Sequence, residues 1–161
     1  HLYKPLFVLR EPIINAEEKI VPGLDGRKMS KSYENVIPLL GNEKNLKKSI
    51  MKIVTNSLEP GIPKDYSDST IFDLYQYFAN TDEINEFKKS YDDGISWGEA
   101  KEKLFSSINA ELIPIRSKYE ELINDKDYLN DVLSDGAKKA RVLALDKIEQ
   151  IKEVIGITKI S

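Results

Sequence analysis

A short basic segment near the start of the chain carries side chains suited to binding phosphate groups. It lies within "PGLDGRKMSKSYENVIPLL", Pro22 to Leu40, and holds Arg27, Lys28 and Lys31 beside serine and glycine residues. Lysine ammonium groups can stabilise the negative charge that develops as a pyrophosphate leaves, and serine hydroxyls supply further donors. These residue types therefore indicate a loop that binds a triphosphate.

A loop is a useful carrier for these cations because it can open to admit a nucleotide and close for chemistry. Gly26 permits a tight turn, so Lys28 and Lys31 can converge on one ligand. We therefore expect the segment from Gly23 to Ser32 to be mobile and not packed on its own domain.

Two other interpretations fit the same residues. A short cationic loop rich in serine and glycine is commonly a solvated surface loop. Arg27 also stands three residues before Ser30, a pattern that a basophilic kinase could phosphorylate. Composition alone leaves both interpretations open.

Composition limits the other chemistry that this chain can perform. The chain has 161 residues, 40% of them apolar and 32% charged, which is typical of a globular protein. It has no apolar run of membrane-spanning length and no secretory signal pattern. Cysteine is absent and His1 is the only histidine, which excludes disulfides, thiolate or histidine metal sites and Ser-His or Cys-His nucleophiles. We expect a cytoplasmic location, no membrane, no metal ligands and, since the chain begins at His1, a fragment.

The first 40 residues are expected to be irregular, and the rest helical. "PLFVL", Pro5 to Leu9, is typical of a short buried strand or extended segment. Prolines and glycines then interrupt the chain as far as Pro38. From Gly41 onward, apolar residues recur at helical spacing.

Five helices are predicted in this second part. Asn42 and Ser69 are candidate N-caps of the first two, and the third should end near Asp92 to Gly94. Pro114 should kink the long fourth helix, and Gly156 should cap the fifth, whose small residues suggest close approach to a neighbouring helix. Aromatic residues of the second helix should pack in a core rather than stack on nucleic-acid bases. The expected buried faces contain Leu46, Ile50 and Val54; Ile71, Leu74, Tyr75 and Phe78; Ile84, Phe87 and Tyr91; Trp97, Ala100, Leu104, Ile108, Leu112, Ile115, Tyr119 and Leu122; and Leu133, Ala137, Ala140, Ala144, Ile148, Ile151 and Ile155.

Four segments of the chain resemble one enzyme family. "KMSKS", Lys28 to Ser32, matches the signature loop of class I aminoacyl-tRNA synthetases. The wider segment from Pro22 to Leu40 looks like the corresponding part of a bacterial branch of tryptophanyl-tRNA synthetases. "IMKIVTNS" (50–57), "EAKEKLFSSINAELIPIR" (99–116) and "DGAKKARVLA" (135–144) resemble the helical C-terminal region of that branch.

The resemblance implies a mainly α fold in two parts. Residues 1–40 would be the end of an α/β Rossmann-like catalytic domain with its KMSKS loop, and residues 41–161 a helical anticodon-binding bundle. The family's HIGH-type motif is missing, and the tryptophan pocket would lie upstream of residue 1. We therefore expect this chain alone to be catalytically inactive.

The resemblance also implies the reaction and the residues that serve it. Tryptophan and ATP, with Mg²⁺, would form tryptophanyl-adenylate and pyrophosphate, and the amino acid would pass to tRNA(Trp) in a homodimeric enzyme. Lys28 and Lys31 would be catalytic, in contact with the phosphates, and Met29 would seat the loop against the nucleotide. The residues implied to bind ATP are Ile20, Val21, Lys28, Met29, Ser30, Lys31 and Ser32.

A second basic cluster, "AKKAR", lies on the last predicted helix. Lys138, Lys139 and Arg141 could contact tRNA phosphates, and Arg116 could join them if the last two helices pack together. They could equally form a solvated helix face. The net charge of −3 confines any RNA contact to a local patch. The alternative to a ligase is a helical RNA-binding or interaction module whose basic loop has no catalytic role.

Overall fold

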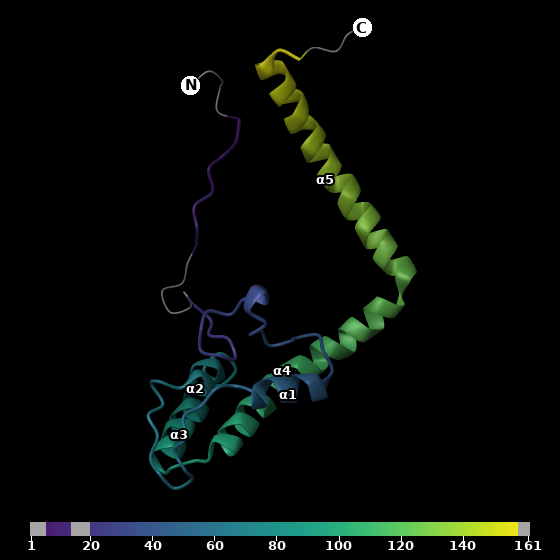
Figure 1. The fold of residues 1–161 in the computed structure, drawn as a ribbon. Coiled ribbons are helices and arrows are strands. Elements are labelled where there is room, and N and C mark those ends of the chain that lie inside the picture. The colour runs from purple at the N-terminus through teal and green to yellow at the C-terminus, as the bar shows by residue number, and fades with distance from the viewer. Residues whose placement is uncertain (1–5, 14–19, 158–161) are drawn as a thin grey trace. The chain divides into compact units, whose positions relative to one another are not determined.

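The computed structural model describes residues 6–13 and 20–157, and the described chain is built from helices. The described residues contain no strand, although an isolated antiparallel bridge joins Pro22 to Lys28. The predicted mainly α fold is confirmed, while a remnant of an α/β domain stays a prediction. In chain order the elements are a 3-10 turn, η2 (Lys31–Tyr33), and the helices α1 (Glu43–Met51), α2 (Thr70–Tyr75), α3 (Thr81–Asp92), α4 (Trp97–Asn124) and α5 (Lys126–Ile155) (Figure 1).

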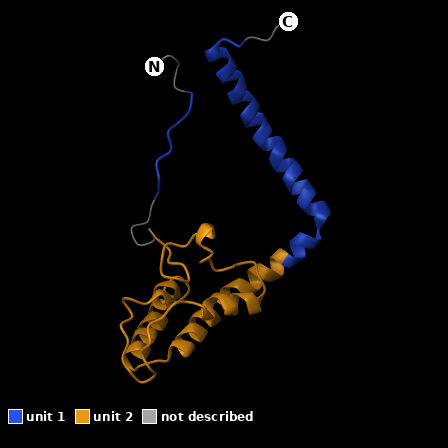
Figure 2. Ribbon diagram, in the orientation of Figure 1, with its two compact units in different colours: residues 1–14, 120–161 blue, residues 15–119 orange. Residues whose placement is uncertain are grey.

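The chain divides into two compact units, residues 15–119 and residues 1–14 with 120–161 (Figure 2). The basic loop belongs to the unit of residues 15–119, together with α1, α2 and α3. The predicted domain boundary after residue 40 stays a prediction. None of the described helices is both long and apolar enough to cross a lipid bilayer.

The first two helices begin where polar side chains satisfy otherwise unpaired backbone N–H groups. The Oδ1 atom of Asn42 accepts a hydrogen bond from the amide of Asn45 at 2.8 Å. The Oγ atom of Ser69 accepts one from the amide of Phe72 at 3.4 Å. Both predicted N-caps are confirmed.

The unit of residues 15–119 encloses one apolar core to which α1, α2, α3 and α4 all contribute. Its centre is aromatic, with ring centroids 4.4 Å apart for Tyr75 and Phe87 and 5.1 Å apart for Phe87 and Tyr91. The Tyr91 hydroxyl forms a 2.8 Å hydrogen bond with the Ser69 hydroxyl, which satisfies a phenol whose pKa is raised to about 12 by burial. The buried apolar residues are Leu46, Ile50, Ile53, Ile71, Phe72, Leu74, Tyr75, Phe87, Tyr91, Ala100, Leu104, Phe105, Ile108 and Leu112.

The first helix is shorter than predicted, and Val54 does not lie on its buried face. α1 ends at Met51 in a tightened turn, where the amide of Ile53 donates to the carbonyl of Ile50 at 3.1 Å. Ile53 is then 1% exposed, whereas Val54 is 67% exposed. The amide of Val54 donates to the carbonyl of Leu24 at 3.0 Å, which ties the end of α1 to the basic loop.

The segment "PLFVL" is not the short buried strand that is one of its two expected forms, and the other form, an extended segment, stays a prediction. Pro5 lies outside the described residues, and Phe7, Val8 and Leu9 are exposed. A strand becomes stable when it pairs with neighbours and is covered on one face. No described residue pairs with this segment as a strand, so its apolar side chains stay uncovered in this structure.

The fourth helix carries its predicted stripe into the core only along its first half. The stripe is buried from Ala100 to Leu112 and Trp97 is half-buried, whereas Ile115 and Tyr119 are exposed. Pro114 lies inside α4, and the helix continues to Asn124. A kink at Pro114 stays a prediction.

The fifth helix forms as predicted, but its apolar stripe is not buried. Gly156, at a φ of 78°, caps its end and donates to the carbonyls of the last turn. No described side chain of α5 is buried, and Leu133 is 69% exposed. The predicted close approach to a neighbouring helix stays a prediction, because periodicity identifies an apolar face without identifying its cover.

The core assignment predicts the effect of a paired substitution. Leu104 has 0% exposure and Leu143 has 76%. Leu104→Ala should lower the free energy of unfolding by about 2–5 kcal/mol, because it removes buried methyl groups and leaves a cavity. Leu143→Ala should change it by less than about 0.5 kcal/mol. Urea unfolding followed by circular dichroism measures both changes, and equal effects would contradict this core.

Candidate functional site

The basic loop is closed by backbone hydrogen bonds between its two sides. The amide of Met29 donates to the carbonyl of Val21 at 2.9 Å, beside the isolated bridge between Pro22 and Lys28. Inside this closure, the amide of Gly26 donates to the carbonyl of Gly23 at 3.0 Å. Gly26 has a φ of 79°, a conformation that glycine adopts without strain. The loop is therefore a tight turn, as its glycines predict.

The second half of the loop is a capped 3-10 turn that begins with Lys31. The Oγ atom of Ser30 accepts from the amide of Ser32 at 3.3 Å. Glu34 is the C-cap of η2, and its amide donates to the carbonyl of Lys31 at 3.2 Å. Glu34 has a φ of 53°, so it reverses the chain in a conformation that L residues rarely adopt. The position of Lys31 is therefore set by the cap at Ser30.

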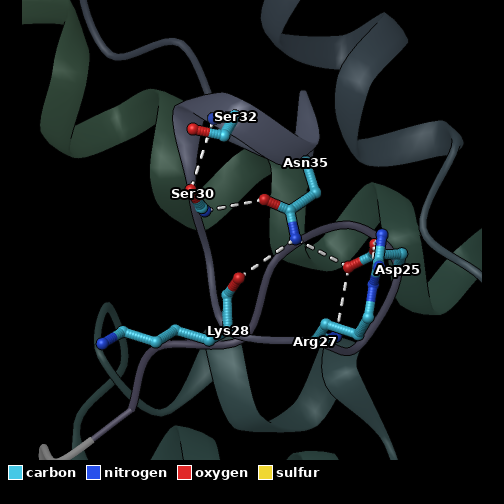
Figure 3. A network of polar contacts seen from close by, with 6 residues as sticks. All are labelled: Asp25, Arg27, Lys28, Ser30, Ser32 and Asn35. Atoms are coloured by element: carbon cyan, nitrogen blue, oxygen red, sulfur yellow. Dashed lines mark hydrogen bonds and ion pairs between the residues drawn. The ribbon is translucent and has the colours of Figure 1, made fainter.

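A buried amide joins the two halves of the loop (Figure 3). Asn35 is 3% exposed, and its Nδ2 atom donates to the Oδ1 atom of Asp25 at 2.7 Å and to the carbonyl of Lys28 at 3.2 Å. Its Oδ1 atom accepts from the amide of Ser30 at 2.8 Å. We call these three contacts the Asn35 bridge. The bridge satisfies both the donors and the acceptor of the buried side chain.

Gly23 makes room for the Asn35 bridge. A Cβ atom added at Gly23 would lie 2.3 Å from the Nδ2 atom of the Asn35 side chain and 2.7 Å from the main-chain carbonyl oxygen of Asn35. The Asn35 carbonyl also accepts from the amide of Leu24 at 2.9 Å. Only glycine fits at position 23 without displacing the amide.

One of the three loop cations is already paired inside the loop. The Nε atom of Arg27 donates to the Oδ2 atom of Asp25 at 2.7 Å, and its guanidinium lies 4.6 Å from the ring centroid of Tyr33. The Asn35 hydrogen bond, together with the Arg27 contacts, lowers the pKa of Asp25 from 3.8 to about 2. Asp25 is therefore ionised at neutral pH and balances the charge of Arg27.

The two lysines remain available for a ligand. Lys28 and Lys31 are both exposed, and neither ammonium group has an ion-pair or hydrogen-bond partner in the part of the chain that the structure describes. The side chain of Lys28 extends away from the Asn35 bridge (Figure 3). Ser32 is exposed beside them, and Ser30 is half-buried. The loop thus presents two unpaired cations and two hydroxyls on a defined turn.

The expectation that this loop is not packed on its own unit is wrong. Leu24, Met29 and Ile37 pack against the core, and Met29 and Val21 line an apolar cavity of about 190 Å³ together with side chains such as Phe78. The turn satisfies its own backbone groups and the thioether is apolar, so packing is favourable without a ligand. This counts against a loop that is ordered only by nucleotide. The contacts of Ile20, Val21 and Met29 with a nucleotide stay predictions.

The second basic cluster is only partly free. Lys139 forms an ion pair with Asp135 at 2.7 Å, one turn earlier on α5. Lys138 and Arg141 are exposed and have no partner among the described residues. Arg116, in the unit of residues 15–119, donates to the Oδ1 atom of Asn109 and to the carbonyl of Leu112 on α4. Contact of any of these four cations with tRNA stays a prediction.

The sequence patterns missed the two residues that organise the loop. Asp25 precedes Gly26, and such an Asp-Gly pair is a known turn signal, but it does not show that the carboxylate pairs with Arg27. Asn35 lies in "YENVI" with no periodic or motif signal of its own. Its burial follows from the turn at Glu34, which directs the chain back toward Gly23.

Comparison with known proteins identifies relatives of the chain. The family model described as class I tRNA synthetases (W and Y) matches residues 2–112. A protein of Neisseria meningitidis named tryptophan–tRNA ligase is 44% identical over 98% of this chain and 47% of its own length. The protein of the same name from Pseudomonas aeruginosa is 42% identical over 98% of this chain and 36% of its own length. The chain thus spans half or less of these relatives.

Solved structures show the same relationship. The crystal structure of tryptophanyl-tRNA synthetase from Campylobacter jejuni, complexed with ADP and tryptophan, matches 94% of this chain with a TM-score of 0.83 and 39% identity. A second structure of the Campylobacter jejuni enzyme matches with a TM-score of 0.79 and 38% identity. The chain covers 48% and 47% of these two proteins.

The Asn35 bridge predicts an unusual titration of Asp25. A carboxyl whose pKa is lowered by folding stabilises the folded loop at pH values above the ordinary pKa of that carboxyl. This contribution is lost as the pH falls from the ordinary 3.8 toward the folded value of about 2. Carbon NMR of the Asp25 carboxyl should therefore give a midpoint of about 2. Asn35→Ala should raise this midpoint, because the Asn35 hydrogen bond is the largest single cause of the shift. An ordinary midpoint in the unaltered chain would contradict the bridge.

Proposed function

The chain belongs to the class I tRNA synthetase family of tryptophan and tyrosine, and we propose that it is part of a tryptophan–tRNA ligase. The choice of tryptophan rests on relatives at 44% and 42% identity that carry the name tryptophan–tRNA ligase. In the proposed role, the basic loop stabilises phosphate charge while tryptophan is activated. The observation that carries this role is that Lys28 and Lys31, which have no described ion-pair partner, lie on a turn held by the buried side-chain amide of Asn35.

The chemistry of activation explains why two lysines are useful. A carboxylate oxygen of tryptophan attacks the α-phosphorus of ATP, and the bond from that phosphorus to the bridging oxygen breaks. Pyrophosphate leaves and gains negative charge in the transition state. Lys28 and Lys31 would donate hydrogen bonds to that group, and cations held in place beforehand need little reorganisation during the reaction.

The serines and the start of the loop have supporting roles in this proposal. The Ser30 hydroxyl accepts from the Ser32 amide and keeps its own O–H free to donate, and the Ser32 hydroxyl is exposed. The main chain near Ile20 and Val21 would approach the adenine, and Met29 would seat the loop against the nucleotide. Mg²⁺ would arrive with ATP as part of the substrate.

The activity and partners of the whole protein extend beyond this chain. The proposal includes tryptophan, ATP and tRNA(Trp) as substrates, a homodimer as the family resemblance implies, and a cytoplasmic location. The chain spans 47% of its Neisseria relative. Positioning of reactants accounts for about 7–11 kcal/mol of barrier lowering in favourable cases. A loop without a facing pocket supplies little of this, so the chain alone should not activate tryptophan.

The catalytic role of Lys31 can be tested in a ligase that contains this chain at the full length of its relatives. Lys31→Ala should slow tryptophan-dependent pyrophosphate exchange by about 10²–10³, since it removes a cation directed at developing charge. The affinity for tryptophan should change little. Lys44→Ala is the control, because Lys44 is an exposed lysine on α1 with no described partner. An unaltered exchange rate in Lys31→Ala would favour the binding-module alternative.

We also propose that the exposed cations of α5 contact tRNA phosphates. Because phosphate contacts release counterions, binding of tRNA(Trp) to the full-length ligase should weaken as salt rises. Lys138→Ala with Arg141→Ala should reduce the slope of log affinity against log salt by about one per lost contact. Adding Lys139→Ala should have a smaller effect, because Lys139 is paired with Asp135. Lys126→Ala, at the start of α5, is the control. An affinity and a salt dependence that these substitutions leave unchanged would favour the interpretation of the cluster as a solvated helix face.

A further inference from the structure

The position of both loop lysines depends on one side chain that is itself neutral. One hydrogen bond of the Asn35 bridge ends on the carbonyl of Lys28, and another begins at the amide of Ser30. Ser30 is the N-cap of the turn whose first residue is Lys31. The Asn35 amide therefore holds the main chain at Lys28 and immediately before Lys31.

We propose that Asn35 is a positioning residue for amino-acid activation: it sets the separation of Lys28 and Lys31 and thereby their fit to the leaving phosphate groups. The proposal rests on the proposed function of the loop and adds a residue that touches neither nucleotide nor phosphate. Its effect on the rate passes entirely through the two lysines.

The geometry explains why an asparagine is needed at this position. The bridge requires two N–H donors and one acceptor on a short planar group. Aspartate lacks the donors, and alanine lacks both. Glutamine is longer by one methylene, in a space where even a Cβ on Gly23 would lie 2.3 Å from the amide nitrogen.

An aspartate at position 35 would also reverse the electrostatics of the bridge. The Nδ2 atom lies 2.7 Å from the Oδ1 atom of Asp25, so a carboxylate there would face a second carboxylate. Asp25 is paired with Arg27 here, and the Lys28 side chain extends away from the bridge (Figure 3). Two adjacent carboxyls favour a shared proton and raise one pKa. Asn35→Asp should therefore open the loop at neutral pH. Acidification should close it in part, because a protonated carboxyl regains one of the two donors of the bridge.

The first experiment measures pyrophosphate exchange in the full-length ligase. Asn35→Ala should lower kcat by about a hundredfold, because a displacement of the order of 1 Å in a reacting group costs that much. KM for tryptophan should stay within about twofold. When Lys28 and Lys31 are both alanine, adding Asn35→Ala should change kcat by less than about twofold, since the residues act as one unit. A stability role alone would leave kcat per folded molecule unchanged, and that result would overturn the proposal.

The second experiment observes the loop without catalysis. Backbone NMR of the same ligase, labelled at the loop, should show displaced Lys28, Ser30 and Lys31 amide signals in Asn35→Asp at pH 7. These signals should return toward those of the unaltered protein as the pH is lowered through the raised pKa of the carboxyl pair. Asn45→Asp is the matched control, because Asn45 is exposed on α1 and should leave signals and exchange unchanged. Loop signals that do not move in Asn35→Asp would overturn the proposal.

The two experiments separate failure of this proposal from failure of the proposed function. If Lys31→Ala slows exchange while Asn35→Ala does not, the positioning role is wrong and the function of the loop stands. If the loop is displaced in Asn35→Asp while exchange is unchanged in both Asn35→Asp and Lys31→Ala, the proposed function is wrong. The positioning role then falls with it.

Discussion

The buried amide of Asn35 is the contact on which the geometry of the basic loop depends. It satisfies one side chain and two main-chain groups at three places in the loop. The same residue accepts from Leu24, whose carbonyl accepts from Val54 just after α1. A continuous set of hydrogen bonds therefore runs from the main chain at the lysines to the segment that follows α1. Because α1 and α4 share that core, the loop is part of the helical unit rather than an appendage to it.

Charge on the loop is organised by pairing as much as by number. The sequence places three cations in a chain whose net charge is −3. Arg27 is neutralised by Asp25, and its guanidinium also covers the ring of Tyr33. The unpaired positive charge of the three cations is thereby confined to Lys28 and Lys31, and the exposed Glu34 lies close to them in the sequence. Such a local field can attract a polyanion, while the acidic remainder of the chain disfavours non-specific phosphate binding elsewhere.

The sequence predicted those parts of the structure that local rules decide. The caps at Asn42 and Ser69, most of the buried faces of the first four helices as far as Leu112, and the cap at Gly156 follow from spacing and side-chain chemistry, whereas the predicted burial of Val54 is wrong. The KMSKS letters located the candidate site. The role of Asn35 could not be predicted, because its burial depends on a left-handed turn and on the absence of a Cβ at Gly23. The stripe on α5 and the "PLFVL" segment show a second limit, since an apolar pattern does not identify what covers it.

The close approach of Gly23 and Asn35 also restricts which sequences can carry this loop. These two positions are twelve residues apart in the chain and behave as one site. A side chain at the first would need a smaller residue at the second, and the smaller residue would forfeit the donors that the turn requires. A substitution at only one of the two positions would disrupt the turn, so descendants of this sequence should keep both residues or lose both. A search of related loops for glycine and asparagine at that separation would distinguish copies that retain this turn from copies in which the lysines survive on a differently folded segment.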